Sequence, residues 1–473
     1  MMKGDWSKLA IKKISKEEQR RKLMAAIEAD KKAAEKAGEM CSIGMLKDFE
    51  ISNRENYFLT GILGIDGNTN GFKKGTFNVL YGAESSGKST MALETVAAYQ
   101  MMYPDDIILY VDTEQTVDDA FLDRIPGINK SNIYFIKDIG MERIFDKVNE
   151  YTKEGIVDFV VIDSIDTMVP LKEEEKSLED SVMMVKANIL SRALAKISSS
   201  IYQHGITVLM IQQVRTTFAG MIAKTNGRSG GNAAKFYPAT VNFLSKISSQ
   251  NDKQSDEIYG DRIVNQYCKI KNEKSKISEP YKETYTYLNT DRSKKGGVSK
   301  MRELIDYAIS YGLIEAKGAW CYYTDINTGE VVKVNGKNQL TQKIASEIDL
   351  YSTFKFQIYG KILPPELLIT KFEDIKVLLE KENQLMKKNK IDYLKVISRE
   401  DLISDLDRTT FSLQDKNILD IISQEEYDLG TFILKSDEEK DSFIQEIENK
   451  NKMKNLDLKP VEEMSNEENE IEE

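Results

Sequence analysis

Short hydrophobic runs alternate with stretches of helical character between residues 51 and 250. The runs are rich in β-branched and aromatic residues and read FNVLYG (77–82), DIILYVDT (106–113), DFVVIDS (158–164) and ITVLMIQQ (206–213). A strand that is buried on both faces is hydrophobic throughout, whereas a half-exposed strand alternates. The pattern therefore predicts an α/β fold, with a mainly parallel central sheet flanked by helices on both faces.

The chain has a different character on either side of this region. Residues 16–37 consist largely of strong helix formers and predict an N-terminal helix. The polar stretch NTDRSKKGGVSK (289–300) predicts a boundary, beyond which the alternation weakens. We expect five segments: an N-terminal helical segment (1–50), an α/β core (51–290), a small α+β lobe (291–350), a helical extension (351–455) and a disordered acidic tail (456–473).

The composition, with 41% hydrophobic residues, is that of an ordinary globular protein with a sizeable core. Its hydrophobic runs are much shorter than the roughly 18–20 residues that span a bilayer, so we expect no membrane partner. The charged N-terminus lacks the apolar core of a secretory signal. The three cysteines lie far apart in the sequence, which argues against a zinc site or a disulfide framework. These features together favour a cytoplasmic protein.

The net charge of −11 argues, taken alone, against nucleic acid as a partner. The charge is unevenly spread, however, because residues 462–473 carry seven carboxylates and no base. Residues 1–37 carry eleven lysines and arginines against six acids. A total over the whole chain therefore does not exclude a local basic surface.

The segment GAESSGKS (82–89) matches the phosphate-loop pattern GxxxxGK[ST] in full, between a predicted strand and a predicted helix. Glycines let the backbone N–H groups curl around phosphate oxygens, Lys88 supplies a positive charge to the β- and γ-phosphates, and Ser89 offers a hydroxyl to Mg²⁺. The pattern predicts an ATP site that uses Mg²⁺. Its expected nucleotide-binding residues are Gly82, Ala83, Glu84, Ser85, Ser86, Gly87, Lys88, Ser89 and Thr90.

Polar residues follow three other predicted strands and belong at the same edge of a parallel sheet. Asp163 ends DFVVID, where a carboxylate holds Mg²⁺ together with Ser89. Glu114 follows DIILYVDT, where a carboxylate orients the attacking water. Gln213 ends ITVLMIQQ and is a candidate to bond the γ-phosphate. A single acidic residue after a strand is more often a solvated loop residue, and position alone leaves the role of Gln213 open.

Together these segments resemble the RecA family of homologous-recombination ATPases. YGAESSGKST resembles the phosphate loop of the family, VDTEQTVDDAF the segment with its catalytic glutamate, and VVIDSIDTMVP its metal-binding strand. The resemblance implies that Glu114 is the catalytic glutamate. It also implies that Asp118 contacts adenine and that Phe121, in place of the usual tyrosine, stacks on it.

The segment QQVRTTFAGMIAKTNGRSGGNAAKFY (212–237) resembles the second DNA-binding loop of the family, although KTNGRS replaces an acidic, threonine-rich run. LEDSVMMVKANIL resembles the distal end of the first loop, within 172–187. Basic side chains suit phosphates and apolar ones suit base steps, although such a segment read alone is more often a flexible surface loop. The DNA contacts implied are Met183, Lys186, Arg215, Phe218, Ile222, Lys224, Arg228, Gly230, Gly231 and Asn232.

KSKISEPYK (274–282) resembles the segment with which a neighbouring RecA subunit reaches the γ-phosphate. The resemblance implies that Lys274 and Lys276 act on the ATP of the next subunit, although two alternating lysines usually mark only a solvated face. ATP at a head-to-tail subunit interface that does not close implies a helical filament. LIDYAISYGLIEAKGAWCYY resembles the small C-terminal domain that gathers duplex DNA, and the acidic tail is either autoinhibitory or only solubilising.

The resemblance thus implies a DNA-dependent ATPase that forms filaments on single-stranded DNA and catalyses homologous pairing and strand exchange with double-stranded DNA. Mediator and single-strand-binding proteins are candidate partners, in the cytoplasm of a bacterium or a phage-infected cell. One alternative is a hexameric helicase or DNA-repair ATPase on the same core. Another is a regulatory or structural relative that binds nucleotide only, against which the presence of Glu114 argues.

Overall fold

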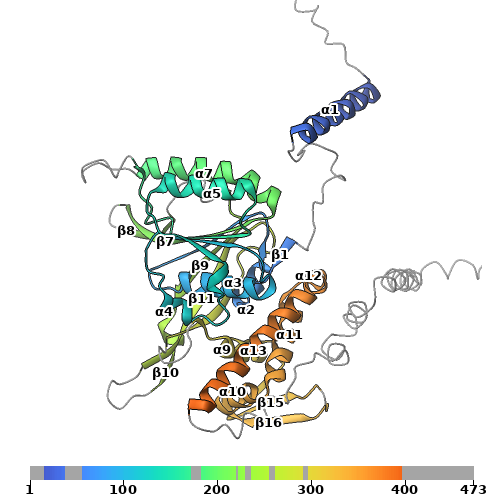
Figure 1. The fold of residues 1–473 in the computed structure, drawn as a ribbon. Helices are drawn as coiled ribbons and strands as arrows, with labels where there is room; N and C mark the ends of the chain where they lie inside the picture. Colours follow the sequence, from blue (N-terminus) through green and yellow to red (C-terminus); the bar gives the residue numbers. More distant parts are fainter. Residues whose placement is uncertain are drawn as a thin grey trace, which may run out of the picture. The chain divides into compact units, whose positions relative to one another are not determined.

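A computed structural model describes residues 15–37, 56–171, 183–219, 222–228, 236–254, 262–290, 297–326 and 328–396 (Figure 1). Its contacts divide the chain into two units, one that ends at Arg54 and one that begins at Glu55. The first unit contains the helix α1 (Lys16–Ala37), over the residues at which the sequence predicts an N-terminal helix. No helix in the described ranges is both long enough and apolar enough to cross a membrane. The predicted acidic tail lies outside the described residues.

One mixed sheet dominates the second unit, and the described residues give it eleven strands in the order β13-β12-β11-β9-β3-β7-β6-β4-β5, with β10 beside β11 and β8 beside β7. The strands from β9 to β5 in this order run parallel, whereas β11, β12 and β13 continue the sheet antiparallel. The parallel strands are β3 (Phe77–Gly82), β4 (Ile108–Asp112), β5 (Ile133–Ile136), β6 (Phe159–Asp163), β7 (Thr207–Ala219) and β9 (Thr240–Lys246). The others are β8 (Ile222–Arg228), β10 (Asp252–Gln254), β11 (Arg262–Ser275), β12 (Glu283–Asn289) and β13 (Gly297–Val298).

The predicted α/β fold with a mainly parallel sheet is confirmed, and β3, β4 and β6 are buried along their whole length. The strand that was expected to end at Gln213 instead continues to Ala219, because β7 runs on beyond the parallel sheet and pairs antiparallel with β8. The antiparallel strand β11 has no counterpart in the prediction. Its sequence, RIVNQYCKIKNEKS, is too polar to read as a buried strand.

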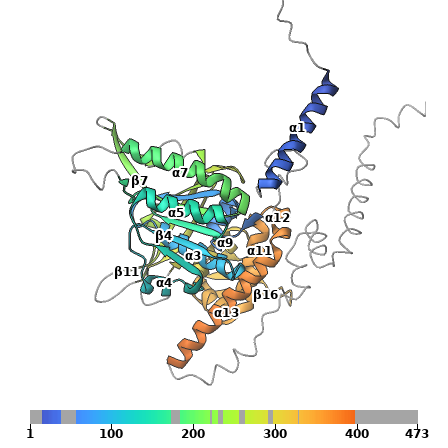
Figure 2. The ribbon, with the colours of Figure 1, turned by 45° about the horizontal axis from the view of Figure 1, so that its top comes forward.

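Helices cover both faces of the sheet (Figures 1 and 2). On one face α5 (Met141–Glu154) and α7 (Met183–His204) pack over Val79 and Tyr81 of β3, and on the other α3 (Lys88–Met102) packs over Leu80. Successive side chains of a strand point to opposite faces, so burial of both faces requires apolar residues at every position. The continuous hydrophobic runs follow from this arrangement. The remaining short elements are β1 (Tyr57–Phe58), α2 (Leu63–Thr69), β2 (Phe72–Lys73), α4 (Asp119–Asp123), η4 (Lys130–Asn132) and η5 (Ser248–Gln250).

The carboxy-terminal part is an α+β arrangement that packs on the core. It consists of α9 (Lys300–Ser310), the antiparallel strands β14 (Glu315–Lys317), β15 (Trp320–Thr324) and β16 (Val331–Asn335), and the helices α10 (Gly336–Ser346), α11 (Ile348–Ile362), α12 (Pro365–Thr370) and α13 (Phe372–Val396). Its hydrophobic cluster includes Leu59 and Leu63 from beside α2, and Leu378 of α13 belongs to the core beneath α3. The boundaries expected near 290 and 350 do not appear as breaks, because helices from both sides share one core.

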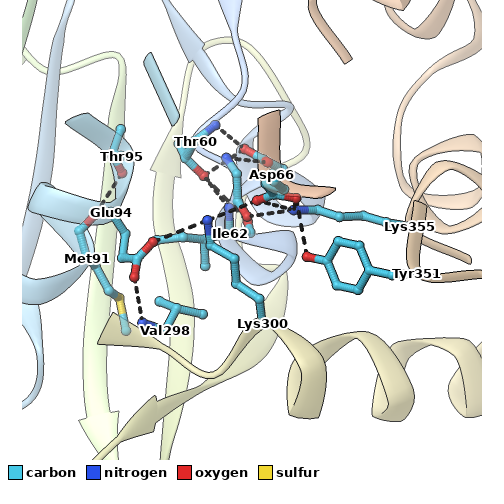
Figure 3. A network of polar contacts seen from close by, with 12 residues as sticks. Thr60, Ile62, Asp66, Met91, Glu94, Thr95, Val298, Lys300, Tyr351 and Lys355 are labelled. Carbon is cyan, nitrogen blue, oxygen red and sulfur yellow. Dashed lines mark hydrogen bonds and ion pairs between the residues drawn. The ribbon is translucent and has the colours of Figure 1, made fainter. Parts of the chain in front are cut away.

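Asp66 of α2 is the centre of a buried polar cluster (Figure 3). Its Oδ1 accepts hydrogen bonds from the amide and the hydroxyl of Thr60, both at 2.8 Å. Its Oδ2 accepts from the amide of Gly61 at 3.1 Å and from the hydroxyl of Tyr359 on α11 at 3.2 Å. Burial raises the pKa of the Asp66 carboxyl to about 6, although the bonds from Thr60 and the nearby Lys355 ammonium lower it. The cluster fixes α11 to the loop before α2.

We predict that Asp66→Ala lowers the free energy of unfolding by about 3–5 kcal/mol, because four buried donors lose their acceptor. Urea denaturation followed by circular dichroism measures the change. Asp105→Ala, which removes an exposed turn carboxylate, is the control and changes the free energy by less than about 0.5 kcal/mol. A loss of less than about 1 kcal/mol for Asp66→Ala would show that water replaces the carboxylate at little cost.

Candidate active site

The loop between β3 and α3 needs glycine at both ends of its motif. A Cβ atom on Gly82 would overlap the carbonyl oxygen of Leu244 on the neighbouring strand β9. Gly87 has a φ of +91°, and a Cβ atom there would overlap Cδ1 of Leu288. The backbone can approach its neighbours this closely only without side chains. Contacts with β9 at Gly82 and with β12 at Gly87 therefore leave no room for a side chain at either end of the loop.

Lys88 begins α3 and is buried, with 7% of its surface exposed. Its ammonium donates to the carbonyl oxygen of Ala83 at 2.8 Å and to that of Gly82 at 3.2 Å. Burial lowers the pKa of Lys88, and the carboxylates of Asp163 and Glu114 oppose this effect. A cavity of about 380 Å³ opens beside this ammonium. Its lining includes Glu84, Ser85, Gly87, Lys88, Ser89, Thr90, Glu114, Phe121, Asp163 and Gln213 from the predicted site.

Asp163 ends β6 and has 2% of its surface exposed. Its Oδ2 accepts from the Tyr110 hydroxyl at 2.9 Å, and its carboxylate also accepts from the Ser89 hydroxyl. Burial raises the pKa of Asp163 to about 6, although these two bonds lower it. Oδ1 is buried without a hydrogen-bond partner among the described residues. A buried carboxylate oxygen without a partner, next to a serine hydroxyl, fits the oxygen ligands that Mg²⁺ prefers.

Glu114 and Gln213, from different strands, meet at the same edge of the sheet. Oε1 of Glu114 accepts from the Ser164 hydroxyl at 2.8 Å and from the side-chain amide of Gln213 at 3.1 Å. The backbone amide of Gln213 donates to Oδ2 of Asp166 at 2.6 Å. The Thr113 hydroxyl is bonded to both the amide and the carbonyl of Ser164, at 2.8 and 2.7 Å. The glutamate is thus held in a fixed orientation by β4, β6 and β7 together.

The far end of the cavity is built from segments that are distant in the sequence. Phe121 lines it, as expected. Asp118 is instead exposed and begins α4, where its Oδ1 accepts from the amide of Phe121 at 2.7 Å. Asp118 therefore fixes the turn that carries Phe121, and it is not part of the described lining. Six further lining residues had no signal in the sequence, and three of them belong to the stretch that was interpreted as a boundary. The six are Arg124, Gln266, Leu288, Asn289, Thr290 and Gly297.

The family described as the RecA N-terminal domain matches residues 21–291, more than half of the 473 residues of this chain. The chain belongs to the RecA family. It is 32% identical over 297 residues to the protein RecA of Mycoplasma mobile, which covers 62% of this chain and 84% of that protein. It is 30% identical over 327 residues to the protein RecA of Campylobacter hominis, which covers 68% and 89%. A solved structure of the RadB recombinase is a weaker match, with 20% identity, a TM-score of 0.35, and coverage of 50% of this chain and 95% of that chain.

RecA-family membership makes this protein a RecA-type recombinase that uses a nucleotide, as the sequence predicted.

The two lysines expected to act on a neighbouring subunit lie at the surface end of β11 and just beyond it. Lys274 and Lys276 both donate to the carbonyl oxygen of Phe236, each at 3.0 Å. Neither is part of the described lining of the cavity in its own chain.

The segment that was expected to form the second DNA-binding loop begins as a β-hairpin. Arg215 and Phe218 lie in β7, and Ile222, Lys224 and Arg228 lie in β8, with Arg215 paired to Gly227 and Phe218 to Ala223. In the first segment, Met183 begins α7, and the Lys186 ammonium donates to the carbonyl oxygens of Asp166 and Met168 at 2.6 and 2.7 Å. The remaining predicted contacts, Gly230, Gly231 and Asn232, lie outside the described residues.

We predict that Gly87→Ala abolishes nucleotide binding, with an affinity loss of more than about 100-fold, because the added methyl group displaces the loop from its anion-binding shape. Titration with a fluorescent ATP analogue measures the affinity. Gly312→Ala is the matched control, because Gly312 has a similar φ of +73° but nothing near its Cβ position. It keeps the wild-type affinity and lowers stability by roughly 1–2 kcal/mol. Equal affinities for the two variants would contradict the required shape of the loop.

Proposed function

We propose that the cavity above the phosphate loop binds ATP and that the protein uses it to pair and exchange DNA strands. The loop amides and Lys88 bind the phosphates, and Phe121 faces the base end. Ser89 and Asp163 would hold Mg²⁺, for which the unpartnered Oδ1 is the support. When bound, the ion neutralises charge on the β- and γ-phosphate oxygens.

Glu114 orients the water that attacks the γ-phosphate. A carboxylate serves in this role only if it cannot rotate away, and the bonds from Ser164 and Gln213 to its Oε1 restrict that rotation. The contacts come from Ser164, which follows β6, and from Gln213 within the neighbouring strand β7, so the water position is defined by the sheet. Lys88 lines the same cavity and would stabilise the negative charge that develops on the γ-phosphate.

The observation that carries the recombinase proposal is the position of Gln213. Its side chain bonds the proposed catalytic glutamate, and its strand β7 continues without a break into the β7–β8 hairpin. A γ-phosphate that attracts the Gln213 amide changes the start of the hairpin. The nucleotide and a ligand of the hairpin therefore share one element, which is the physical basis of coupling between two sites.

The hairpin and the segment before α7 are proposed to bind single-stranded DNA. Arg215, Lys224 and Arg228, which lie in the paired strands, would bind phosphates, and Phe218 and Ile222 would contact base steps. The salt-dependent phosphate contacts hold the strand, and apolar insertion opens the stack for pairing with a duplex. The acidic total charge of the chain does not oppose this, because the proposed contacts are local. We place this activity in the cytoplasm, with mediator and single-strand-binding proteins as candidate partners.

Lys274 and Lys276 are proposed to complete the ATP site of the next subunit in a helical filament. In a single chain both ammonium groups contact the carbonyl oxygen of Phe236, a residue with 69% of its surface exposed. Both contacts lie at an exposed position of the chain, where a phosphate of the next subunit can compete for the two cations. Such trans-acting cations typically contribute about 10³–10⁵ in rate.

A strand-exchange assay tests the function. We expect the wild type to form joint molecules with ATP and a non-hydrolysable analogue. Glu114→Gln retains pairing but hydrolyses ATP at least about 100-fold more slowly. Glu154→Gln, at an exposed position in α5, is the control and keeps the wild-type rate. Wild-type protein that hydrolyses ATP, forms closed rings in electron micrographs and pairs no strands would favour a helicase, and unchanged hydrolysis by Glu114→Gln would remove its catalytic role.

A mixed-subunit experiment tests the trans-acting lysines. The variant Lys274→Ala/Lys276→Ala binds ATP without hydrolysing it, and Lys88→Ala lacks the phosphate site but presents both lysines. An equal mixture recovers about a quarter of the wild-type rate, since a quarter of random head-to-tail interfaces join an intact phosphate site to intact lysines. Lys269→Ala/Lys271→Ala, with the same charge loss on the same strand, retains its activity. No recovery in the mixture would contradict an interface site.

A further inference from the structure

The carboxy-terminal helix α13 places a carboxylate, Glu382, deep in the protein between two lysines. The Lys355 ammonium of α11 lies 2.7 Å from Oε2 and 2.9 Å from Oε1 of Glu382, and the Lys300 ammonium of α9 lies 2.9 Å from Oε1. The Tyr351 hydroxyl also donates to Oε2 at 3.2 Å. Glu382 has 4% and Lys355 1% of its surface exposed. These are buried ion pairs within the polar network of Figure 3.

The same network reaches the helix that follows the phosphate loop. Lys300 lies 3.3 Å from Oε2 of Glu94, a side chain of α3 with 1% of its surface exposed. Oε1 of Glu94 accepts from the backbone amide of Val298 in β13 at 3.0 Å. Figure 3 shows Glu94 between Val298 and Lys300. Contacts therefore run from α13 through Lys300 and Glu94 to the backbone of β13.

Strand β13 forms part of the wall of the nucleotide cavity. Gly297, next to Val298, lines the cavity and has a φ of +102°. A Cβ atom on Gly297 would overlap the carboxylate of Glu94 and would lie 3.2 Å from Cδ1 of Ile125, which follows α4. The position of this wall is therefore set by the Glu94 carboxylate. If Glu94 shifts, the wall shifts with it.

A second contact of α13 supports the α4 side of the cavity. Leu385 packs against the core beneath α3, and its Cδ1 lies 3.3 Å from the Cβ position of Gly127. Gly127 follows Phe121 and Arg124, which line the same end of the cavity. One helix thus supports both segments between which a nucleoside would lie.

Each charged group of this network compensates a charge of opposite sign. The four groups are Glu94, Lys300, Lys355 and Glu382. Burial alone would raise the pKa of Glu382, but Lys300 and Lys355 hold it at about 2. Burial also raises the pKa of Glu94, which Lys300 opposes. Two buried cations balance two buried carboxylates, and removal of a single member leaves an uncompensated charge. Ion pairs of this kind define position more strictly than apolar contacts do, because each buried ion must stay beside its partner to offset its desolvation cost.

We propose that Glu382 is a positioning residue for the nucleoside end of the cavity, acting through Lys300 and Glu94 on Gly297 and Val298. The proposal rests on the proposed binding of ATP in this cavity. Under this proposal, residues 372–396 help to set the shape of the nucleotide site. They lie beyond the part of the chain that matches the RecA N-terminal domain. The phosphate end is formed by the loop itself and does not depend on α13.

A charge-balanced double variant, Lys300→Met/Glu94→Gln, tests this proposal. It removes one cation and one anion, leaves the Lys355–Glu382 pair intact, and keeps an oxygen at position 94. We expect the KM for ATP to rise about tenfold and kcat to change by less than about threefold. The affinity for magnesium tripolyphosphate, which contacts only the phosphate loop, stays at the wild-type value. The control is Glu373→Gln, which removes an exposed carboxylate from α13, the helix that contains Glu382. It keeps the wild-type KM.

Glu382→Asp provides an independent variant if the double variant does not fold. It keeps the charge but retracts the carboxylate by one methylene group, and the KM for ATP rises about threefold. A folded variant of either kind with the wild-type KM overturns the proposal. An equal loss of affinity for ATP and tripolyphosphate also overturns it, because the effect would then lie at the loop. Wild-type protein that fails to bind ATP would instead refute the proposed function.

Discussion

The chemistry of this protein depends on one buried ammonium group, that of Lys88, among carboxylates. Asp163, Glu114, Asp166 and Glu84 all act on its pKa, and burial acts in the opposite direction. Without this cation, a triphosphate would meet a cluster of like charges in a poorly solvated site. The parallel register brings these groups together, since Asp112 pairs with Asp163 and the strand before the phosphate loop pairs Gly82 with Gln213.

The same register explains why the nucleotide site and the β7–β8 hairpin are connected by a single strand, β7. In a parallel sheet, all functional side chains leave at the carboxyl edge, and most strands end there. Strand β7 does not end there but continues to Ala219. Gln213 is therefore the last position that faces the phosphate site and nearly the first of the hairpin. A change in the hydrogen bond of the Gln213 amide therefore needs no long pathway to reach the hairpin that we propose binds DNA.

Sequence reading succeeded where the information is local. The phosphate loop is contiguous, and the runs that form β3, β4 and β6 are hydrophobic throughout because both of their faces are buried. The position of Glu114 in the cavity lining was expected from its place after a strand and from the family resemblance. In each of these cases, one short segment forms the structural feature and also contains the sequence pattern that predicts it.

The remaining part of the site could not be predicted because its residues are brought together only by the antiparallel half of the sheet. Leu288 and Gly297 lie in or beside a polar stretch that resembles a linker, and nothing near them in the sequence indicates a cavity wall. The extension of β7 was missed for a related reason. Its residues after Gln213, VRTTFA, form no continuous hydrophobic run, and they pair only with β8. Pairing between distant segments decides these features, and local periodicity does not report it.

The buried ion pairs of α13 show how a carboxy-terminal segment can become part of an enzyme core. An apolar helix face would dock with similar affinity in several registers, since hydrophobic contact is non-directional. Charges at Lys300, Lys355 and Glu382 allow one register only, because any other leaves an ion buried without a partner. The removal of these charged groups from water costs free energy, so a gain in stability does not explain the ion pairs. Their arrangement is explained by position: they fix α13 relative to Glu94, and Glu94 fixes the backbone that closes the nucleotide cavity.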